Sequence, residues 1–257
     1  MNTEILSNHY LKKELSNLLS NLNSEEIGKI FWKSLKEAFK VTSMHNIANL
    51  IKTIIKIFKL SIDFLNYMFL IIENEKFYFW KRLFLDYKKF LRRKIIFIKK
   101  TWKSLSYLEK KAVMIDLTII TVSALVFGGG LDFEGGAPDL DLKFGIGNHR
   151  NLFSHTILLG LTLEFGLRFI GNVLINLEKK GIKPNFEMLS LILSFIKGQY
   201  KKVIKGMWIG LFFHYLKDSK ILFGKTKPYT GLYELNIRTH KRIFATNAIL
   251  SAIFANS

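Results

Sequence analysis

Residues 112–131, AVMIDLTIITVSALVFGGGL, form the stretch that most limits how this chain can fold. These twenty residues include one charged side chain, Asp116. A helix of about 20 apolar residues is long enough to cross the hydrocarbon core of a bilayer. The stretch therefore predicts a transmembrane helix or a helix buried on all sides, and the glycines at 128–130 predict its end.

The remaining apolar segments also favour helices. Residues 152–176 form a second long apolar segment, in which Glu164 and Arg168 are four residues apart and can pair on one helical face. Shorter apolar runs cover residues 188–196, 206–216 and 243–257, and no strand-like alternation is evident. We therefore predict an all-α, membrane-associated helical bundle with one to four spanning helices.

The first part of the chain is more basic than the second. Up to Lys111 there are 22 Lys/Arg against 10 Asp/Glu, and from Ala112 onward 17 against 10. We predict a basic amphipathic helical region over residues 1–111 and an apolar helical domain over residues 112–257. In the first region, Asn23 or Ser24 is expected to cap a helix. Between Asn46 and Trp102 there is neither Gly nor Pro, which favours one or two long helices.

Within the first region, residues 81–103 combine ten Lys/Arg with one acidic residue, Asp86, and with interleaved aromatic residues. A basic amphipathic helix of this kind is typical of an anionic membrane surface. A solvated basic face and a nucleic-acid contact are the alternatives. The residues expected to contact lipid headgroups are Lys81, Arg82, Lys88, Lys89, Arg92, Arg93, Lys94, Lys99 and Lys100.

Composition restricts the chemistry. The chain has no Cys, which excludes disulfides, iron–sulfur clusters, Cys-ligated zinc and a Cys nucleophile. Any metal site must therefore use His, Asp and Glu. The formal net charge of +19 favours phosphate-bearing partners, namely lipid headgroups or nucleic acid.

Three short polar motifs interrupt the apolar second part. An Asp-x-Asp pair, Asp139 and Asp141, follows Pro138 in a loop that we expect to be extended, so that both carboxylates face one side. His214 and Asp218 are four residues apart on a predicted helix and meet on one face. Because ionisable groups are costly in apolar surroundings, their joint presence predicts a metal or acid–base site.

The third motif, HRNLFSH, carries His149, Arg150 and His155. His155 is expected at the start of a helix with Ser154 as a possible cap, where the positive dipole end favours a neutral ring. Arg150 can bind phosphate or carboxylate oxygens. His9 and His240 lie in charged stretches and are expected to be exposed.

Together the motifs PDLD, HRNLFSH and FHYLKD resemble the membrane-bound metal-dependent hydrolase family, which includes the LexA-regulated inner-membrane hydrolases of bacteria. The resemblance covers about residues 112–230. Asn151 and Thr156 stand where the family pattern has Gly and Ser, and the two His are one residue further apart. The resemblance leaves open which His is a ligand and which an acid or base. It implies a site built from Asp139, Asp141, His149, His155, His214 and Asp218.

Our hypothesis from the sequence is metal-assisted hydrolysis of a phosphoester or ester, with a lipid substrate favoured, at the inner or cytoplasmic membrane. One or two divalent ions, Zn²⁺ favoured and Mn²⁺ possible, would bind Asp139, Asp141, His155, His214 and Asp218. His149 would act as acid or base and Arg150 would stabilise developing charge. The basic region would lie on the cytoplasmic side. A homo-oligomer is a further expected partner, because apolar runs too short to span a membrane alone would need neighbours.

Two other classes of function remain open from the sequence. One is a membrane-disrupting or scaffolding protein without turnover, in which the His/Asp cluster is structural. The other, less favoured, is a nucleic-acid-binding protein or nuclease, in which the basic aromatic segment contacts phosphates.

Overall fold

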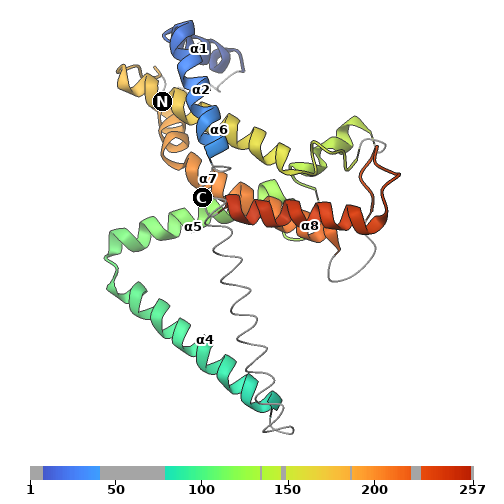
Figure 1. Cartoon of the computed structure of the whole chain (residues 1–257). Coiled ribbons are helices and arrows are strands. Elements are labelled where there is room, and N and C mark those ends of the chain that lie inside the picture. The colour runs from blue at the N-terminus through green and yellow to red at the C-terminus, as the bar shows by residue number, and fades with distance from the viewer. Residues whose placement is uncertain are drawn as a thin grey trace. The chain divides into compact units, whose positions relative to one another are not determined.

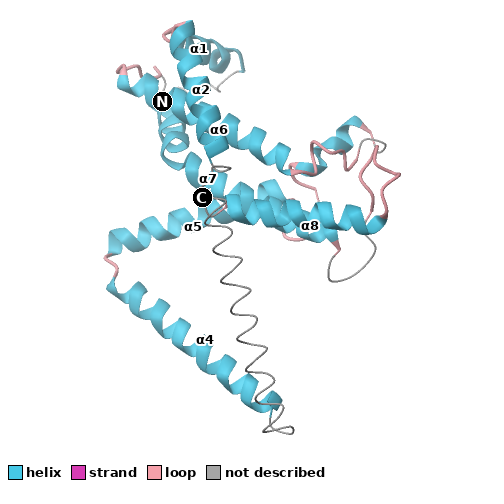
Figure 2. Ribbon diagram, viewed as in Figure 1, coloured by secondary structure: helices cyan, strands magenta, loops and turns pink. Residues whose placement is uncertain are grey.

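The computed structural model of the chain describes residues 8–40, 79–133, 135–145, 149–185, 187–220 and 227–255. Within these ranges the chain folds into helices joined by turns and loops (Figure 1). Figure 2 shows helix in every element described and strand in none. The predicted all-α fold is confirmed. Much of the segment between Asn46 and Trp102 lies outside the described residues, so its first part is not tested.

The chain divides into two compact units, one of residues 43–115 and one that joins residues 1–42 to residues 116–257. The boundary at 115 is close to the division expected near residue 111. The N-terminal helices, however, belong with the second part of the chain, whereas the sequence pattern grouped them with the basic region.

In the unit of residues 43–115, the described part is α4 (Phe79–Ser104) and the start of α5 (Tyr107–Gly128). The chain turns between them because Ser106 and Glu109 cap α5 reciprocally. The Ser106 N–H donates to Glu109 Oε2 at 2.7 Å, and the Glu109 N–H donates to Ser106 Oγ at 3.3 Å. At 3.6 residues per turn, most Lys/Arg of α4 share one face and most aromatic residues the opposite face.

The basic residues expected at a membrane surface all lie on α4. The side chains of Lys81 and Arg82 lie outside the described residues. The other seven side chains are exposed: Lys88, Lys89, Arg92, Arg93, Lys94, Lys99 and Lys100. Lys94 lies on the aromatic face, with its Nζ 5.5 Å from the ring centre of Phe90.

The larger unit begins with α1 (Asn8–Ser20) and α2 (Ser24–Lys40). Asn23 caps α2, as predicted: its Oδ1 accepts from the Glu26 N–H at 2.8 Å, and Glu26 Oε2 accepts from the Asn23 N–H at 3.0 Å. The α2 helix packs against α6 (Ile157–Lys179), where the amide of Asn172 donates to Ser34 Oγ at 3.0 Å. This buried contact joins positions far apart in the sequence.

The core of the larger unit lies among α6, α7 (Glu187–Ser219) and α8 (Ile237–Phe254). Trp208 of α7 is fully buried and packs on Phe254, and its indole N–H donates to Glu164 at 2.7 Å. Glu164 also pairs with Arg168 at 2.6 Å, as its spacing predicted. The runs at 188–196 and 206–216 are parts of the single helix α7, not separate segments.

Small residues let α5 and α7 approach each other closely. A Cβ on Gly210 would lie 2.3 Å from the backbone O of Ala124, and one on Gly206 would lie 2.4 Å from that of Ile120. Close contacts between helices commonly use this pattern of small residues four apart. The contact extends to Gly128, which ends α5 beside α7 as the glycine run predicted.

Among the described residues, two helices are long and apolar enough to cross a membrane, α5 and α6. The α5 helix buries Ser123, Ala124 and Gly128, while some of its aliphatic side chains, such as Leu117 and Val126, are more than half exposed. Their length and composition fit membrane association.

Candidate functional site

The turn after α5 brings the acidic motif to the end of α7. Asp139 and Asp141 lie on the 3₁₀ helix η1 (Pro138–Phe144). The prediction of an extended loop is therefore wrong, because the backbone turns tightly here. The carboxylates nevertheless converge, because both lie within 3.6 Å of Nδ1 of His149. The turn also fixes Asp139, whose Oδ2 accepts from the Gly135 N–H at 2.6 Å.

Asp141 holds the segment that carries the two site histidines of the third motif. Its Oδ2 accepts from the Arg150 N–H at 2.9 Å and from the Ser154 hydroxyl at 2.5 Å. Asn151 donates to the same oxygen from its amide at 3.3 Å. Arg150 adopts a left-handed backbone conformation with φ of 65°, which these bonds stabilise. Asp141 thus uses one carboxylate oxygen to shape the backbone around it.

The start of α6 differs from the sequence prediction. Thr156, not Ser154, is the N-cap, and its hydroxyl accepts from the Leu158 N–H. Ser154 instead donates to Asp141, and its Oγ lies 2.9 Å from Nδ1 of His155. His155 therefore precedes the helix and is oriented by polar side chains.

His155, just before α6, and His214, near the end of α7, are both oriented by contacts at Nδ1. In His155, Nδ1 lies beside Ser154 Oγ and 3.3 Å from Asp141 Oδ2. In His214, Nδ1 lies 3.2 Å from the carbonyl O of Gly128, an acceptor that requires the proton on this nitrogen. When Nδ1 carries the proton, Nε2 offers a lone pair. The small-residue contact between α5 and α7 thus fixes the tautomer of His214.

The two Nε2 atoms face two carboxylate oxygens in a buried ring of four atoms, which we call the four-atom ring. His155 Nε2 lies 3.2 Å from Asp139 Oδ1 and 3.6 Å from Asp218 Oδ2. His214 Nε2 lies 3.8 Å and 3.5 Å from the same two oxygens. His214 and Asp218 meet on one face of α7, as their spacing predicted.

The four-atom ring combines one contact at hydrogen-bond distance, His155 Nε2 to Asp139 Oδ1, with two unsatisfied atoms. Among the described residues, Nε2 of His214 and Oδ2 of Asp218 are buried without a hydrogen-bond partner. Burial is the largest influence on the pKa of His214 and lowers it, against the opposing effects of Asp218 and Asp139. A neutral ring with an inward lone pair, set against two carboxylates, is an electron-rich cavity that a cation would satisfy.

The dimensions of the four-atom ring fit a small divalent cation. Ligand atoms placed tetrahedrally at about 2.0–2.1 Å from zinc stand about 3.3 Å apart. Four of the six separations that a tetrahedral site requires, at 3.2–3.8 Å, are close to that value. Two overlapping groups of side chains could hold the cation: Asp139 with His149 and His155, and His155 with His214 and Asp218.

His149 and Arg150 border the four-atom ring. Nδ1 of His149 lies 3.2 Å from Asp141 Oδ1, and this His could also join Asp139 and His155 around an ion. Arg150 donates from Nη2 to Asp218 Oδ1 at 2.8 Å, which orients the other oxygen of Asp218 into the ring. All seven residues predicted for the site therefore lie in one cluster.

Sequence reasoning missed the residues that hold the backbone around His155. The hydroxyls of Tyr229 and Tyr215, both fully buried, donate at 2.8 Å to the carbonyls of His155 and Thr156. The prediction that His240 is exposed is wrong: it is fully buried on α8, and its Nδ1 accepts from the Tyr229 N–H at 3.2 Å. Its charged neighbours in sequence face other sides of the helix.

A pocket of about 330 Å³ opens beside the four-atom ring. Its lining includes the site residues Asp139, His149, Arg150, His214 and Asp218, together with basic and apolar side chains. The pocket gives a ligand direct access to the cluster.

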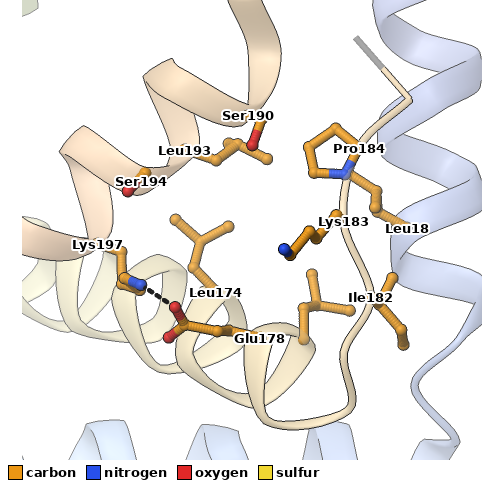
Figure 3. Close-up of a pocket in the computed structure, with 11 residues that line it drawn as sticks. Leu18, Leu174, Glu178, Ile182, Lys183, Pro184, Ser190, Leu193, Ser194 and Lys197 are labelled. Atoms are coloured by element: carbon orange, nitrogen blue, oxygen red, sulfur yellow. Dashed lines mark hydrogen bonds and ion pairs between the residues drawn. The ribbon is translucent and has the colours of Figure 1, made fainter. Parts of the chain in front are cut away.

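Figure 3 shows a second cavity, of about 280 Å³, in the same unit. Its labelled side chains combine aliphatic residues with serines and charged residues, and Glu178 and Lys197 form an ion pair across one side. Its eleven lining residues include one carboxylate and no histidine, so this cavity lacks the ligand set of the four-atom ring.

Comparison with known proteins adds no relative: no family model, no curated protein and no solved structure matches this chain.

Proposed function

We propose that this protein is a membrane-associated, metal-dependent hydrolase. The observation that carries the proposal is the four-atom ring, in which two imidazole lone pairs and two carboxylate oxygens face one another in a buried space. In this proposal Asp139, His155, His214 and Asp218 are the ligands. Asp141, expected as a ligand from the sequence, acts as a positioning residue because its oxygens already accept several hydrogen bonds.

Two imidazoles and two carboxylates favour Zn²⁺, with Mn²⁺ as the second choice. When bound, such an ion would lower the pKa of water toward about 7 and polarise the bond that is cleaved. The hydrogen bonds at Nδ1 of both histidines are the outer contacts that metal-binding imidazoles usually make.

His149 is the acid–base residue in this proposal. Asp141 accepts at Nδ1 of His149, which leaves Nε2 to take a proton from the attacking water and to return it to the leaving group. His149 lines the pocket and is partly exposed, as a proton-transferring residue must be. Arg150 keeps Asp218 in place through its 2.8 Å ion pair.

Membrane association is supported by three helices. The α5 and α6 helices have the length and hydropathy of membrane spans, and α4 presents opposed basic and aromatic faces. We propose that α4 lies on anionic lipid at the cytoplasmic side of the inner or cytoplasmic membrane, where the lipid surface is negatively charged. This position would concentrate a lipid substrate near the site.

Metal analysis tests the proposal. Protein purified in detergent should contain at least one equivalent of Zn²⁺ or Mn²⁺ by inductively coupled plasma mass spectrometry. The double variant Asp139→Ala/His214→Ala should lose it, because half of the ligand set is removed, while keeping its helical circular dichroism. The variant Asp132→Ala, which removes an exposed carboxylate nearby, is the matched control and should keep the metal. Equal metal content in all three proteins would overturn the proposal.

A further inference from the structure

We infer that the substrate is a phosphate ester whose phosphate group binds in the pocket beside the four-atom ring. The inference rests on the proposed function and names its substrate class. It is carried by the basic lining of the pocket, which the metal-site argument does not use: Lys217, Lys220 and Lys227 join Arg150 around the opening.

The three lysines come from the end of α7 and from the segment that returns toward α8. Lys217 precedes the ligand Asp218 in sequence, and its Nζ donates to the carbonyl of Asp132 at 2.6 Å. Lys220 follows the last turn of α7 in a left-handed conformation with φ of 47°. The backbone carbonyl of Lys227 lies 3.5 Å from Nη1 of Arg150, which ties this lysine to the site.

The charge balance of the pocket favours an anion. Its lining contains four cationic side chains against two carboxylates, Asp139 and Asp218. Both carboxylates already face histidines or Arg150 in the cluster. A divalent ion in the four-atom ring would add further positive charge. An uncharged ester would leave this field unbalanced, whereas a phosphate ester supplies one or two negative charges and several acceptor oxygens.

The size of the pocket limits what enters it. About 330 Å³ is near the lower end of the range for small-molecule sites, about 300–1,000 Å³, so it suits a phosphate group with a small alcohol. Phe133 and Leu142 form an apolar part of the lining. A lipid headgroup and a soluble phosphomonoester share this chemistry, and only the remainder of the substrate distinguishes them.

The reaction that follows is hydrolysis at phosphorus. The oxygen of water forms a bond to phosphorus while the bond between phosphorus and the ester oxygen breaks. His149 takes a proton from the water and gives it to the ester oxygen, which leaves as an alcohol. A phosphomonoester then yields inorganic phosphate, and no oxidant or second substrate is needed.

Binding of inorganic phosphate, measured by isothermal titration calorimetry on the full chain in detergent, tests the inference. The double variant Lys220→Ala/Lys227→Ala should bind phosphate at least tenfold more weakly than wild type. Its metal content should be unchanged, because neither lysine is in the four-atom ring. The matched control Lys12→Ala/Lys13→Ala removes two exposed lysines of α1 and should bind phosphate as wild type does.

Turnover assays separate the two sources of phosphate. Short-chain phosphatidic acid in micelles and glycerol phosphate in solution are compared with an uncharged short-chain acyl ester. We expect the wild-type protein to release phosphate from at least one of the two phosphate esters and the double lysine variant to release less. The ester that is hydrolysed faster shows whether the natural substrate is a lipid or a soluble phosphomonoester. Unchanged phosphate affinity in the variant, or cleavage of the acyl ester alone, overturns the inference. Wild-type protein without metal would overturn the proposed function itself, whatever the phosphate affinity.

Discussion

At the scale of single residues, Asp141 shows how one carboxylate can organise the polypeptide around a site through hydrogen bonds. Its Oδ2 fixes the backbone at Arg150 and the hydroxyl of Ser154, and its Oδ1 faces Nδ1 of His149. Hydrogen bonds and the nearby His155 lower the pKa of Asp141, although burial, the largest single influence, opposes them. The ionised form is thus the one that holds the segment.

Replacing this carboxylate should weaken metal binding without abolishing it. The variant Asp141→Asn keeps the shape of the side chain but loses the charge and part of its acceptor capacity. Loss of such an outer contact typically costs about 10–100-fold in metal affinity. Competition with a chromophoric chelator measures the affinity, with Asp132→Asn as the control for an exposed carboxylate. Complete loss of metal would instead indicate that Asp141 is itself a ligand.

The sequence predicted single residues well where the relation is local. His214 and Asp218 were paired correctly because a helix fixes the geometry of residues four apart. The burial of His240 was predicted wrongly, since charged neighbours in sequence do not show which face of a helix is covered. The carbonyl of Gly128 as partner of His214 was not foreseen, because backbone groups carry no sequence signal.

At the scale of elements, the contact between α5 and α7 positions half of the four-atom ring. His214 and Asp218 belong to α7, and α5 supplies the carbonyl that orients His214. Gly206 and Gly210 of α7 let the backbones of α5 and α7 approach each other closely. A change that separates these helices should therefore disturb both stability and metal binding.

The variant Gly210→Ala tests this contact. Its Cβ would meet the backbone O of Ala124 at 2.3 Å, and backbone atoms cannot move aside without shifting a helix. We expect a loss of about 1–3 kcal/mol in stability and a lower metal affinity. Gly198→Ala on the same helix has nothing within 4 Å of its Cβ and should stabilise by up to about 1 kcal/mol. Thermal denaturation in detergent compares the stabilities of the two variants. Equal changes in stability would contradict a role for the contact between α5 and α7.

The extent of the elements was only partly predictable. The helical spans at α5 and α6 followed from long apolar runs. The single helix α7 was read as two runs because the lysines from Lys197 to Lys205 interrupt its hydrophobicity. Lysine is a good helix former, so the helix continues through them. The 3₁₀ turn at η1 was also missed, since Asp-x-Asp fits both an extended and a tightly turned backbone.

At the scale of the whole molecule, the grouping of the chain depends on contacts between distant positions. The N-terminal helices join the larger unit through buried contacts such as Ser34 with Asn172. Such pairings leave no local pattern, which is why the division at residue 111 separated these helices from their partners. The character of α4, by contrast, could be predicted, because amphipathicity is a property of one segment.

Charge reversal on α4 tests the lipid-binding part of the proposal. Arg92→Glu/Arg93→Glu/Lys99→Glu/Lys100→Glu should weaken binding to vesicles containing phosphatidylserine at least about 100-fold, since each basic residue near the surface contributes about 1 kcal/mol. Co-sedimentation with the vesicles measures the loss. The control, Lys12→Glu/Lys13→Glu/Lys36→Glu/Lys179→Glu, changes the net charge equally on exposed residues of the other unit.

Three results distinguish a lipid-bound hydrolase from the other classes of function. Equal loss in both charge-reversal variants would show that net charge, not α4, attracts the protein to lipid. Tight and steeply salt-dependent binding of lipid-free protein to nucleic acid would favour the nucleic-acid alternative. Membrane binding without any turnover or metal would favour a scaffolding role.

The aliphatic surface of α5 also affects how the protein must be made in the cell. Side chains such as Leu117, Val122 and Val126 are more than half exposed along this helix. A newly synthesised copy left in water would aggregate through this surface or be held by chaperones and degraded. Its lifetime therefore depends on how soon this helix is covered after leaving the ribosome.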